Sequence, residues 1–371
     1  MPRPAVVVLL LCLTACAPTH CAAGQQAPAY LGQAQIPSGT RFDGTVIGGL
    51  SAISYDPGRD CYYLISDDRS ARGPARFYTA RLTLSSNGID NVTVTGVHPL
   101  SDQDGRPFAA LSLGDPPVVP PDPEGIAFDA ARQRLYWSSE GERLTDTPVG
   151  PVLADPWIRI AGLDGSYLGR FAMPPGLAMS AQHTGPRRNT TLEGLTLAPG
   201  GRLLFAAMEG PGYDDGALPD RGHGALTRIT AFDVDSAAPV AQYAYPLEPA
   251  AASADTNGLT DLVALSDTEF LVVERAFSAH TVDRQKVRLF RAEIAAATDV
   301  LGVSSLSGTP VTPVTKTLIA DLSATPGLSP LDNIEGITLG PKLPDGRQSV
   351  VLVSDDNFAP VQVTQFLLFA G

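Results

Sequence analysis

Acidic residues recur at regular spacing along this chain of 371 residues. In the clearest cases, a Glu-Gly pair opens an apolar run, and a second acid closes the next apolar run 16 positions later. Glu124 is followed in this way by Glu140, and Glu193 by Glu209. Paired carboxylates can act as general acids and bases, or as hard oxygen ligands for Ca²⁺ or Mg²⁺. The spacing therefore predicts acid–base or metal chemistry, provided that the fold brings the acids together.

The same pattern occurs five times, in segments that begin at Gly48, Asp122, Thr190, Thr256 and Asp332. Each segment has a polar or acidic residue, an apolar run, a turn rich in Gly, Pro or Asp, and a second apolar run that ends beside an acid. Such self-similarity is typical of repeat folds. The five pairings are Ser51 with Asp67 and Asp68, Glu124 with Glu140, Glu193 with Glu209, Asn257 with Glu274, and Glu335 with Asp355 and Asp356. In this alignment Asn257 takes the place that Glu has in other repeats.

Two further strand-like stretches follow each of the first four repeats, so each unit has the four strands of a propeller blade. The fifth unit has only three before Gly371, and Tyr30–Ile36 can supply the fourth. We predict an all-β propeller of five four-stranded blades, closed by strands from both termini, which hides the sheet edges. A sixth blade over Ser101–Pro121 is an alternative, although this Pro-rich stretch is typical of a loop. A β-sandwich or two separate domains is the other alternative.

The composition supports short strands and argues against several functions. The chain contains 36 Gly and 33 Pro, and 44% of its residues are hydrophobic, which favours many turns around a sizeable core. A net charge of −13, without a basic stripe, argues against nucleic acid as a partner. The sequence has no Gly-x-Ser-x-Gly elbow, no His-Glu-x-x-His motif and no Gly-rich phosphate loop. We expect a monomer that acts on a small molecule.

The N-terminus has the features of an export signal. The apolar run Ala5–Leu13 is too short to span a membrane, and Leu13-Thr14-Ala15-Cys16 resembles a bacterial lipobox. We expect residues 1–16 to be a signal peptide, 17–29 a flexible tether and 30–371 the folded domain. Cys16 would be lipidated and would anchor the protein in the periplasm or cell envelope, its only membrane contact. Secretion after cleavage at Ala23 is the alternative. Cys61, the one cysteine of the folded part, is expected to be a buried hydrophobe.

Antiparallel pairing places the start of one strand beside the end of the next, so the five pairs should converge on one rim of the propeller channel. Crowded carboxylates repel one another, and a metal ion, a basic partner or bound protons can relieve the repulsion. The candidate metal ligands are Asp67, Asp68, Glu140, Glu209, Asn257, Glu274, Asp355 and Asp356, with Ca²⁺ the favoured ion. The candidate catalytic residues are Glu124, Glu193 and Glu335, with Arg69 and Arg275 to hold an anion. Alternatively, the acids accept hydrogen bonds from amides of the neighbouring blade and have only a structural role.

Several sequence blocks resemble the bacterial phytase-like family, described as "esterase-like activity of phytase". The blocks are GGLSAISYD with YYLISDDR, DPEGIAF, LEGLTLAPGG with LLFAAMEG, and NIEGITL with LVSDDN, and the resemblance covers Tyr30–Phe369. It implies a propeller with repeated Glu and Asp and a phosphoester or ester hydrolase activity. The acids that match the family's motifs are Asp67, Asp68, Glu124, Glu193, Glu209, Glu274, Glu335, Asp355 and Asp356.

The resulting functional hypothesis is an exported, metal-assisted hydrolase of a phosphoester or related ester. Two alternatives remain open at this point. One is a non-catalytic cell-envelope binding propeller with structural calcium. The other is a propeller that processes a sugar or a lactone, because fold does not fix function.

Overall fold

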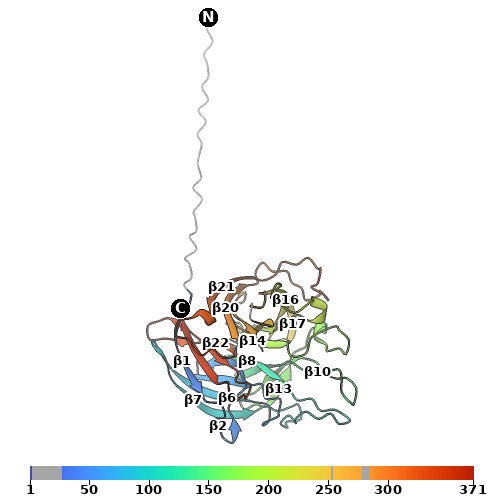
Figure 1. Ribbon diagram of the computed structural model, residues 1–371, viewed down its shortest axis with the longest axis horizontal. Helices are drawn as coiled ribbons and strands as arrows, with labels where there is room; N and C mark the ends of the chain where they lie inside the picture. The colour runs from blue at the N-terminus through green and yellow to red at the C-terminus, as the bar shows by residue number, and fades with distance from the viewer. Residues whose placement is uncertain (2–26, 252–253, 278–284) are drawn as a thin grey trace.

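Five four-stranded antiparallel sheets surround a common centre (Figure 1) in the computed structural model, which describes Met1 and residues 27–251, 254–277 and 285–371. Blade 1 contains β4 (Leu50–Asp56), β5 (Cys61–Ser66), β6 (Arg76–Ser85) and β7 (Gly88–Pro99). Blade 2 contains β8 (Pro123–Asp129), β9 (Arg134–Ser139), β12 (Trp157–Ala161) and β13 (Tyr167–Arg170). Blade 3 contains β14 (Leu192–Leu197), β15 (Leu203–Met208), β16 (Ala225–Asp233) and β17 (Ala238–Leu247).

Blade 4 contains β18 (Thr256–Ala264), β19 (Glu269–Phe277), β20 (Gln285–Glu293) and β21 (Thr315–Asp321). Blade 5 contains β22 (Ile334–Lys342), β23 (Gln348–Ser354), β24 (Thr364–Ala370) and β1 (Ala29–Ile36). Two short hairpins, β2 (Arg41–Phe42) with β3 (Thr45–Val46) and β10 (Glu142–Leu144) with β11 (Val152–Ala154), extend from the blades. The short helices are η1 (Pro175–Leu177), η2 (Tyr213–Asp215) and η3 (Leu322–Ala324).

The first strand of each blade lies innermost. β4, β8, β14, β18 and β22 contact one another in that order, and β22 contacts β4 to complete the ring. β8 is buried along its whole length, whereas the outer strand β7 alternates between covered and exposed side chains. This difference explains the sequence pattern, because a strand covered on both faces needs a continuous apolar run and an outer strand needs only one apolar face.

Five hydrophobic clusters fill the five interfaces between adjacent blades. At the interface of blades 1 and 2, for example, Tyr63 packs near Phe128, and at that of blades 3 and 4, Phe205 meets Phe270 edge to face. The other three interfaces are filled in the same way. The core is therefore distributed around the ring rather than concentrated in one layer, and each blade depends on both neighbours for its burial.

The predicted five-blade architecture and its closure are confirmed. β1 pairs with β24 from Ala29–Ala370 to Ile36–Thr364, so the two ends of the chain share one sheet. Blue β1 lies near the C-terminus in Figure 1. Within the described chain, residues 101–121 form only two isolated bridges and no blade, as expected of a loop.

The predicted signal peptide, Cys16 and most of the tether fall outside the described residues, so these remain predictions. No helix among the residues that are described combines the length and the apolar character needed to cross a bilayer. Cys61 is buried at 8% exposure, as the sequence predicts for a small core residue.

Candidate active site at the rim of the channel

A β-bulge occurs at the same point of every innermost strand. In β14, for example, Leu192 pairs with Met208 and Gly194 pairs with Ala207, so Glu193 has no cross-strand partner. A bulge bends its strand and re-aims the extra side chain. The bulge residues of the five blades are Ser51, Glu124 with Gly125, Glu193, Thr260 and Glu335. Gly194 follows its bulge because a Cβ there would lie 3.0 Å from the Cα of Asp261 in the next blade.

The register of blade 4 corrects the sequence alignment. The prediction that Asn257 takes the place of the repeated Glu is wrong, because Thr260 occupies the bulge and Leu259 pairs with Glu274. Arg275, not Glu274, therefore takes the position that closing acids occupy in the other blades. The cause is that the β18–β19 pairing continues beyond the bulge as far as Thr256. Asn257 is therefore an ordinary paired residue of a longer strand, and the count from Asn257 to Glu274 started from the wrong position. The predicted proximity of Asn257 and Glu274 is confirmed, since the Asn257 Nδ2 donates to Glu274 Oε2 at 2.7 Å.

Eight carboxylates gather at this end of the channel, and we call them the rim acids. They are Asp67, Asp122, Glu124, Glu140, Glu193, Glu209, Glu335 and Asp355. Six are buried, and Asp67 and Glu209 are partly exposed. Burial raises the pKa of every one of them, and the charges of neighbouring rim acids raise the pKa of most of them further. The predicted convergence on one rim is therefore found for acids of blades 1, 2, 3 and 5, whereas blade 4 contributes none of the rim acids.

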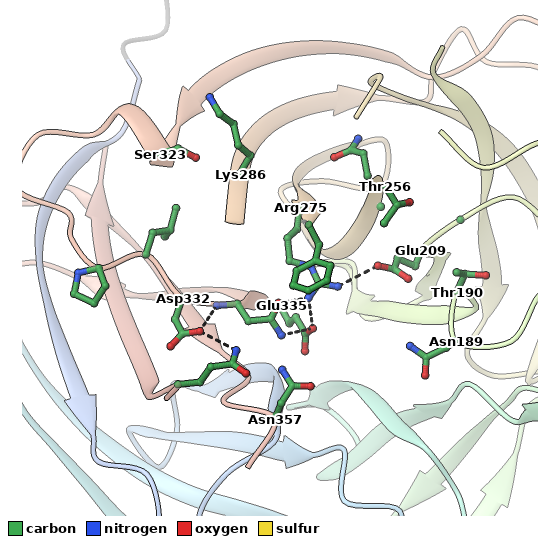
Figure 2. Close-up of a pocket in the computed structure, with 18 of the residues that line it drawn as sticks. Asn189, Thr190, Glu209, Thr256, Arg275, Lys286, Ser323, Asp332, Glu335 and Asn357 are labelled. Carbon is green, nitrogen blue, oxygen red and sulfur yellow. Dashed lines mark hydrogen bonds and ion pairs between the residues drawn. The ribbon is translucent and has the colours of Figure 1, made fainter. Parts of the chain in front are cut away.

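Arg275 is the cation that lies between rim acids of blades 3 and 5. Its NH1 lies 2.7 Å from Glu335 Oε1 and its NH2 lies 3.1 Å from Glu209 Oε1, and NH1 also donates to Asn333 Oδ1 (Figure 2). Burial lowers the pKa of the Arg275 guanidinium, but the nearby carboxylates, led by Glu335, raise it by more, so the group stays charged. Two carboxylates from different blades are thereby held in fixed positions around one planar guanidinium group.

Arg69 occupies the opposite side of the rim, where blade 1 meets blade 2. Its NH2 forms an ion pair with Asp122 Oδ2 and donates to Asn189 Oδ1 at 2.7 Å, and its NH1 lies 3.4 Å from Glu142 Oε2. Glu142 is also bound by Arg188, at 2.6 Å. Both arginines that the sequence analysis assigned to anion binding are thus already engaged by acids.

Asp122, Glu124 and Glu140 form a cluster that could hold a metal ion. One ligand oxygen of each lies within 4.8 Å of the others, and all three residues are buried. Glu140 Oε1 accepts a hydrogen bond from the Thr191 amide, while Oε2 is buried and has no hydrogen-bond partner among the described residues. A buried carboxylate oxygen without a donor needs a cation or a proton, so the donor set fits a hard divalent ion.

A cavity of about 1390 Å³ opens over the rim between blades 3, 4 and 5. Figure 2 shows Arg275 at its floor between Glu209 and Glu335, with Lys286 and Asp332 farther out. The volume exceeds that of a typical small-ligand site. Among the rim acids, only Glu209 and Glu335 line this cavity, so a ligand that enters it would meet them first.

Three acids that the sequence assigned to metal ligation have other partners, and we call them the structural acids: Asp68, Glu274 and Asp356. Asp68 forms a buried ion pair with Arg76, at 2.7 Å, and accepts from the amides of Ala71 and Arg72. Asp356 Oδ1 accepts from the Gly49 amide at 2.9 Å, which joins blade 5 to blade 1.

Glu274 has four partners at the interface of blades 3 and 4. It accepts from the Tyr245 hydroxyl at 2.9 Å and from the Glu248 amide at 3.1 Å, in addition to Asn257 and an ion pair with Lys316. These three acids therefore fit the alternative, considered from the sequence, in which the acids accept hydrogen bonds and have a structural role. The rim acids differ because they lie close to one another and their charges repel.

Sequence reasoning missed Asp122, Asn333 and Asp261. Asp122 and Asn333 both lie two residues before a repeated Glu, so aligning the repeats at that position would have indicated them. Asp261 is buried and accepts from the amides of Leu195 and Ile337, which belong to the two neighbouring blades. Asp261 stands where blades 2, 3 and 5 have Gly and blade 1 has Ala52, and only the bulge register identifies that position.

Comparison with known proteins gives one extensive match. The family model for phytase-like proteins, described as esterase-like activity of phytase, matches residues 45–358. No curated protein sequence matches the chain significantly. Many solved structures resemble it in fold, among them the following three. A hypothetical protein from Leishmania major has 13% identity and a TM-score of 0.41, with 88% of this chain and 86% of that chain covered.

An exo-β-1,3-galactanase from Phanerochaete chrysosporium has 12% identity and a TM-score of 0.43, with 91% of this chain and 64% of that chain covered. A mannose phosphorylase from Leishmania mexicana has 11% identity and a TM-score of 0.44, with 92% and 88% covered. Structural similarity of this degree carries no information on the substrate of the present chain.

Proposed function

Since this chain belongs to the phytase-like family, we propose that its channel rim hydrolyses a phosphoester or a related ester. The observation that supports this most directly is the placement of Glu209 and Glu335 around Arg275 at the floor of a large cavity, with further buried acids behind them. Perturbed pKa values within a cavity are a common property of catalytic groups.

Glu193 is the proposed general base. Burial raises the pKa of its carboxyl, and the charges of Glu140 and Glu209 raise it further, while Arg275 lowers it. A carboxylate whose pKa is raised accepts a proton from water more readily than an ordinary carboxylate does. Glu124 lies near Glu193, and burial and the charge of Glu193 raise its pKa, so it is the proposed second acid–base group while it is not bound to a cation.

Arg275 is the proposed anion-binding group. Its guanidinium is fixed by Glu209 and Glu335 before any substrate arrives, so little reorganisation is needed when negative charge develops on a reacting oxygen. Arg69 is assigned the same role on the other side of the rim, where Asp122 and Glu142 hold it.

Asp122, Glu124 and Glu140 are the residues that would hold a divalent cation, for which we propose Ca²⁺. When bound, such an ion would screen the crowded carboxylates and polarise an ester oxygen. Asp67 Oδ1 is a second buried oxygen without a hydrogen-bond partner in the described parts of the chain. A nearby cation would stabilise this carboxylate as well.

The test is a turnover assay of the full-length protein on p-nitrophenyl phosphate and p-nitrophenyl acetate, with calcium and with chelator. We expect hydrolysis of at least one substrate that is faster with calcium. Absence of turnover on both, with the protein folded, would contradict the proposal. Calcium-dependent stability without turnover would instead support a binding propeller, which is favoured by the acids that join blades, such as Asp356 on the Gly49 amide.

Export also remains a proposal. A Cys16→Ser variant should no longer incorporate labelled palmitate if Cys16 is lipidated, whereas secretion after Ala23 predicts no labelling of either form. We further propose that the protein acts as a monomer, which light scattering would check.

A further inference from the structure

Three buried polar atoms along the cavity have no hydrogen-bond partner among the residues that the structure describes. They are Asn257 Oδ1, Thr190 Oγ1 and Arg275 Nε. A polar atom that is removed from water without a partner costs about 1–3 kcal/mol, so atoms of this kind concentrated in one cavity point to a ligand that pairs with them.

The orientation of the Asn257 amide is fixed by its chemistry. Its Nδ2 donates to Glu248 O at 3.0 Å and to Glu274 Oε2 at 2.7 Å, and both of these atoms are acceptors. Reversing the amide would place Oδ1 against two oxygens, so Oδ1 must be the atom left without a partner. Asn257 is 1% exposed, so Oδ1 has neither a donor among the described residues nor bulk water, and any group that pairs with it must donate a hydrogen bond.

The three atoms together define the kind of group that binds. Asn257 Oδ1 can only accept, Arg275 Nε can only donate, and Thr190 Oγ1 can do either. A hydroxyl group both donates and accepts, so hydroxyl groups can satisfy all three atoms. The dianion of a phosphate monoester has no proton to donate and would leave Asn257 Oδ1 unpaired.

The charge and the apolar part of the cavity agree with this assignment. Three carboxylates, those of Glu209, Asp332 and Glu335, line it against two cations, Arg275 and Lys286. Glu209 and Glu335 already engage Arg275, so the cavity offers no excess positive charge to a polyanion.

Phe277, which ends β19 at the same cavity, is 38% exposed. Large apolar side chains are normally buried, and an aromatic ring left open beside polar groups can pack against the face of a saccharide ring.

We propose that this cavity binds a neutral saccharide, with ring hydroxyl groups on Asn257, Thr190 and Arg275 and a ring face on Phe277. The inference rests on the proposed function in that the saccharide is the alcohol part of the ester. It predicts that the substrate is a singly esterified sugar and not a highly phosphorylated ring.

The test is isothermal titration of the full-length protein at pH 7 with maltose, cellobiose, lactose and inositol hexakisphosphate. We expect at least one disaccharide to bind and the hexakisphosphate to bind more weakly in the absence of added metal. Phe277→Ala should weaken disaccharide binding about tenfold, as loss of an aromatic contact does. Thr190→Val, which keeps the side-chain shape, should weaken it several-fold. Leu168→Ala, at a residue 57% exposed on blade 2, is the matched control and should have no effect.

Failure of every disaccharide to bind at about 10 mM, or equal binding by Phe277→Ala and the control, would overturn the inference. The three polar atoms would then be paired by water. Turnover of p-nitrophenyl substrates is measured on the same preparations. Turnover without saccharide binding would contradict this inference but not the proposed function. Saccharide binding without turnover would contradict the proposed function but not the binding of a saccharide.

Discussion

Arg275 donates to Glu335 Oε1 at 2.7 Å from the strand position where the other four blades have a carboxylate. This substitution of a cation for an acid breaks the symmetry of the ring. The neighbouring acids Glu209 and Glu335 become a fixed pair, while acids on the far side, such as Glu140, keep an unpaired oxygen. A repeat protein needs such a difference between its units to build one site rather than five equal ones.

Replacing Glu193 with Gln should reduce kcat by about 10²–10⁴-fold, the usual loss when a general base is removed. The amide has nearly the same shape and removes one buried charge, so the melting temperature should not fall. Glu269→Gln, in an ion pair with Arg291 at the end of β19 away from the rim, is the control and should retain full activity. Unchanged turnover in Glu193→Gln would exclude this residue as the base.

Replacing Arg275 with Met should destabilise the protein by about 3–5 kcal/mol at pH 8, because the buried Glu335 and the partly buried Glu209 both lose their cation. The loss should be smaller at pH 5, where Glu209 and Glu335 can be neutralised by protons. Burial raises the pKa of both groups and Arg275 now lowers it, so removal of the arginine favours protonation. Urea denaturation at the two pH values measures the difference. An equal loss at both would show that the arginine stabilises by packing alone.

In the absence of metal, the free energy of unfolding should fall as the pH rises from 5 to 8. A carboxyl group with a raised folded-state pKa binds more protons when folded than when unfolded, so deprotonation favours unfolding. The pKa of Asp122 is raised to about 6, and those of the other rim acids are raised as well. His98, whose pKa is lowered by burial, gives the opposite sign but is a single group. Stability that rises over this range in chelator would contradict the raised pKa values.

Calcium should raise the melting temperature, and more so at pH 8 than at pH 5, because it competes with protons for the same oxygens. Glu140→Gln should abolish most of this shift, since it removes a charge from the cluster of Asp122 and Glu124. Asp235→Asn, at a side chain 73% exposed, is the control and should respond as the unaltered protein does. A shift that persists unchanged in Glu140→Gln would place the ion elsewhere.

Replacing Asp68 with Asn should cost about 3–5 kcal/mol of stability, because it leaves the buried Arg76 without its carboxylate. The kcat of the folded fraction and the calcium-induced shift should be unchanged. This separates the structural acids from the rim acids, since a rim acid should affect metal binding or turnover more than stability. Loss of the calcium shift in Asp68→Asn would return Asp68 to the candidate ligands.

The fold was accessible from the sequence because each blade repeats the same local pattern. The Glu-Gly pair at Glu193 marks the bulge of an inner strand, and Gly is required there by the approach of the neighbouring blade. The closing strand at Tyr30–Ile36 could be inferred by counting, since a fifth blade with three strands leaves an unpaired edge. Local patterning of this kind is decided by residues close together in the chain.

The sequence by itself determined that acids recur in five units and that most of these units bring acids to one rim. The tertiary structure decided which of these acids have a basic or hydrogen-bonding partner and which do not. Asp68 and Asp67 are adjacent in the chain, yet Asp68 has Arg76 as its partner while Asp67 Oδ1 has no hydrogen-bond partner within the described residues. The structure also placed Arg275, not Glu274, at the rim, through a bulge at Thr260. The physical reason is that the electrostatic role of each acid depends on neighbours from other blades. The distances to those neighbours cannot be read from the spacing of residues along the chain.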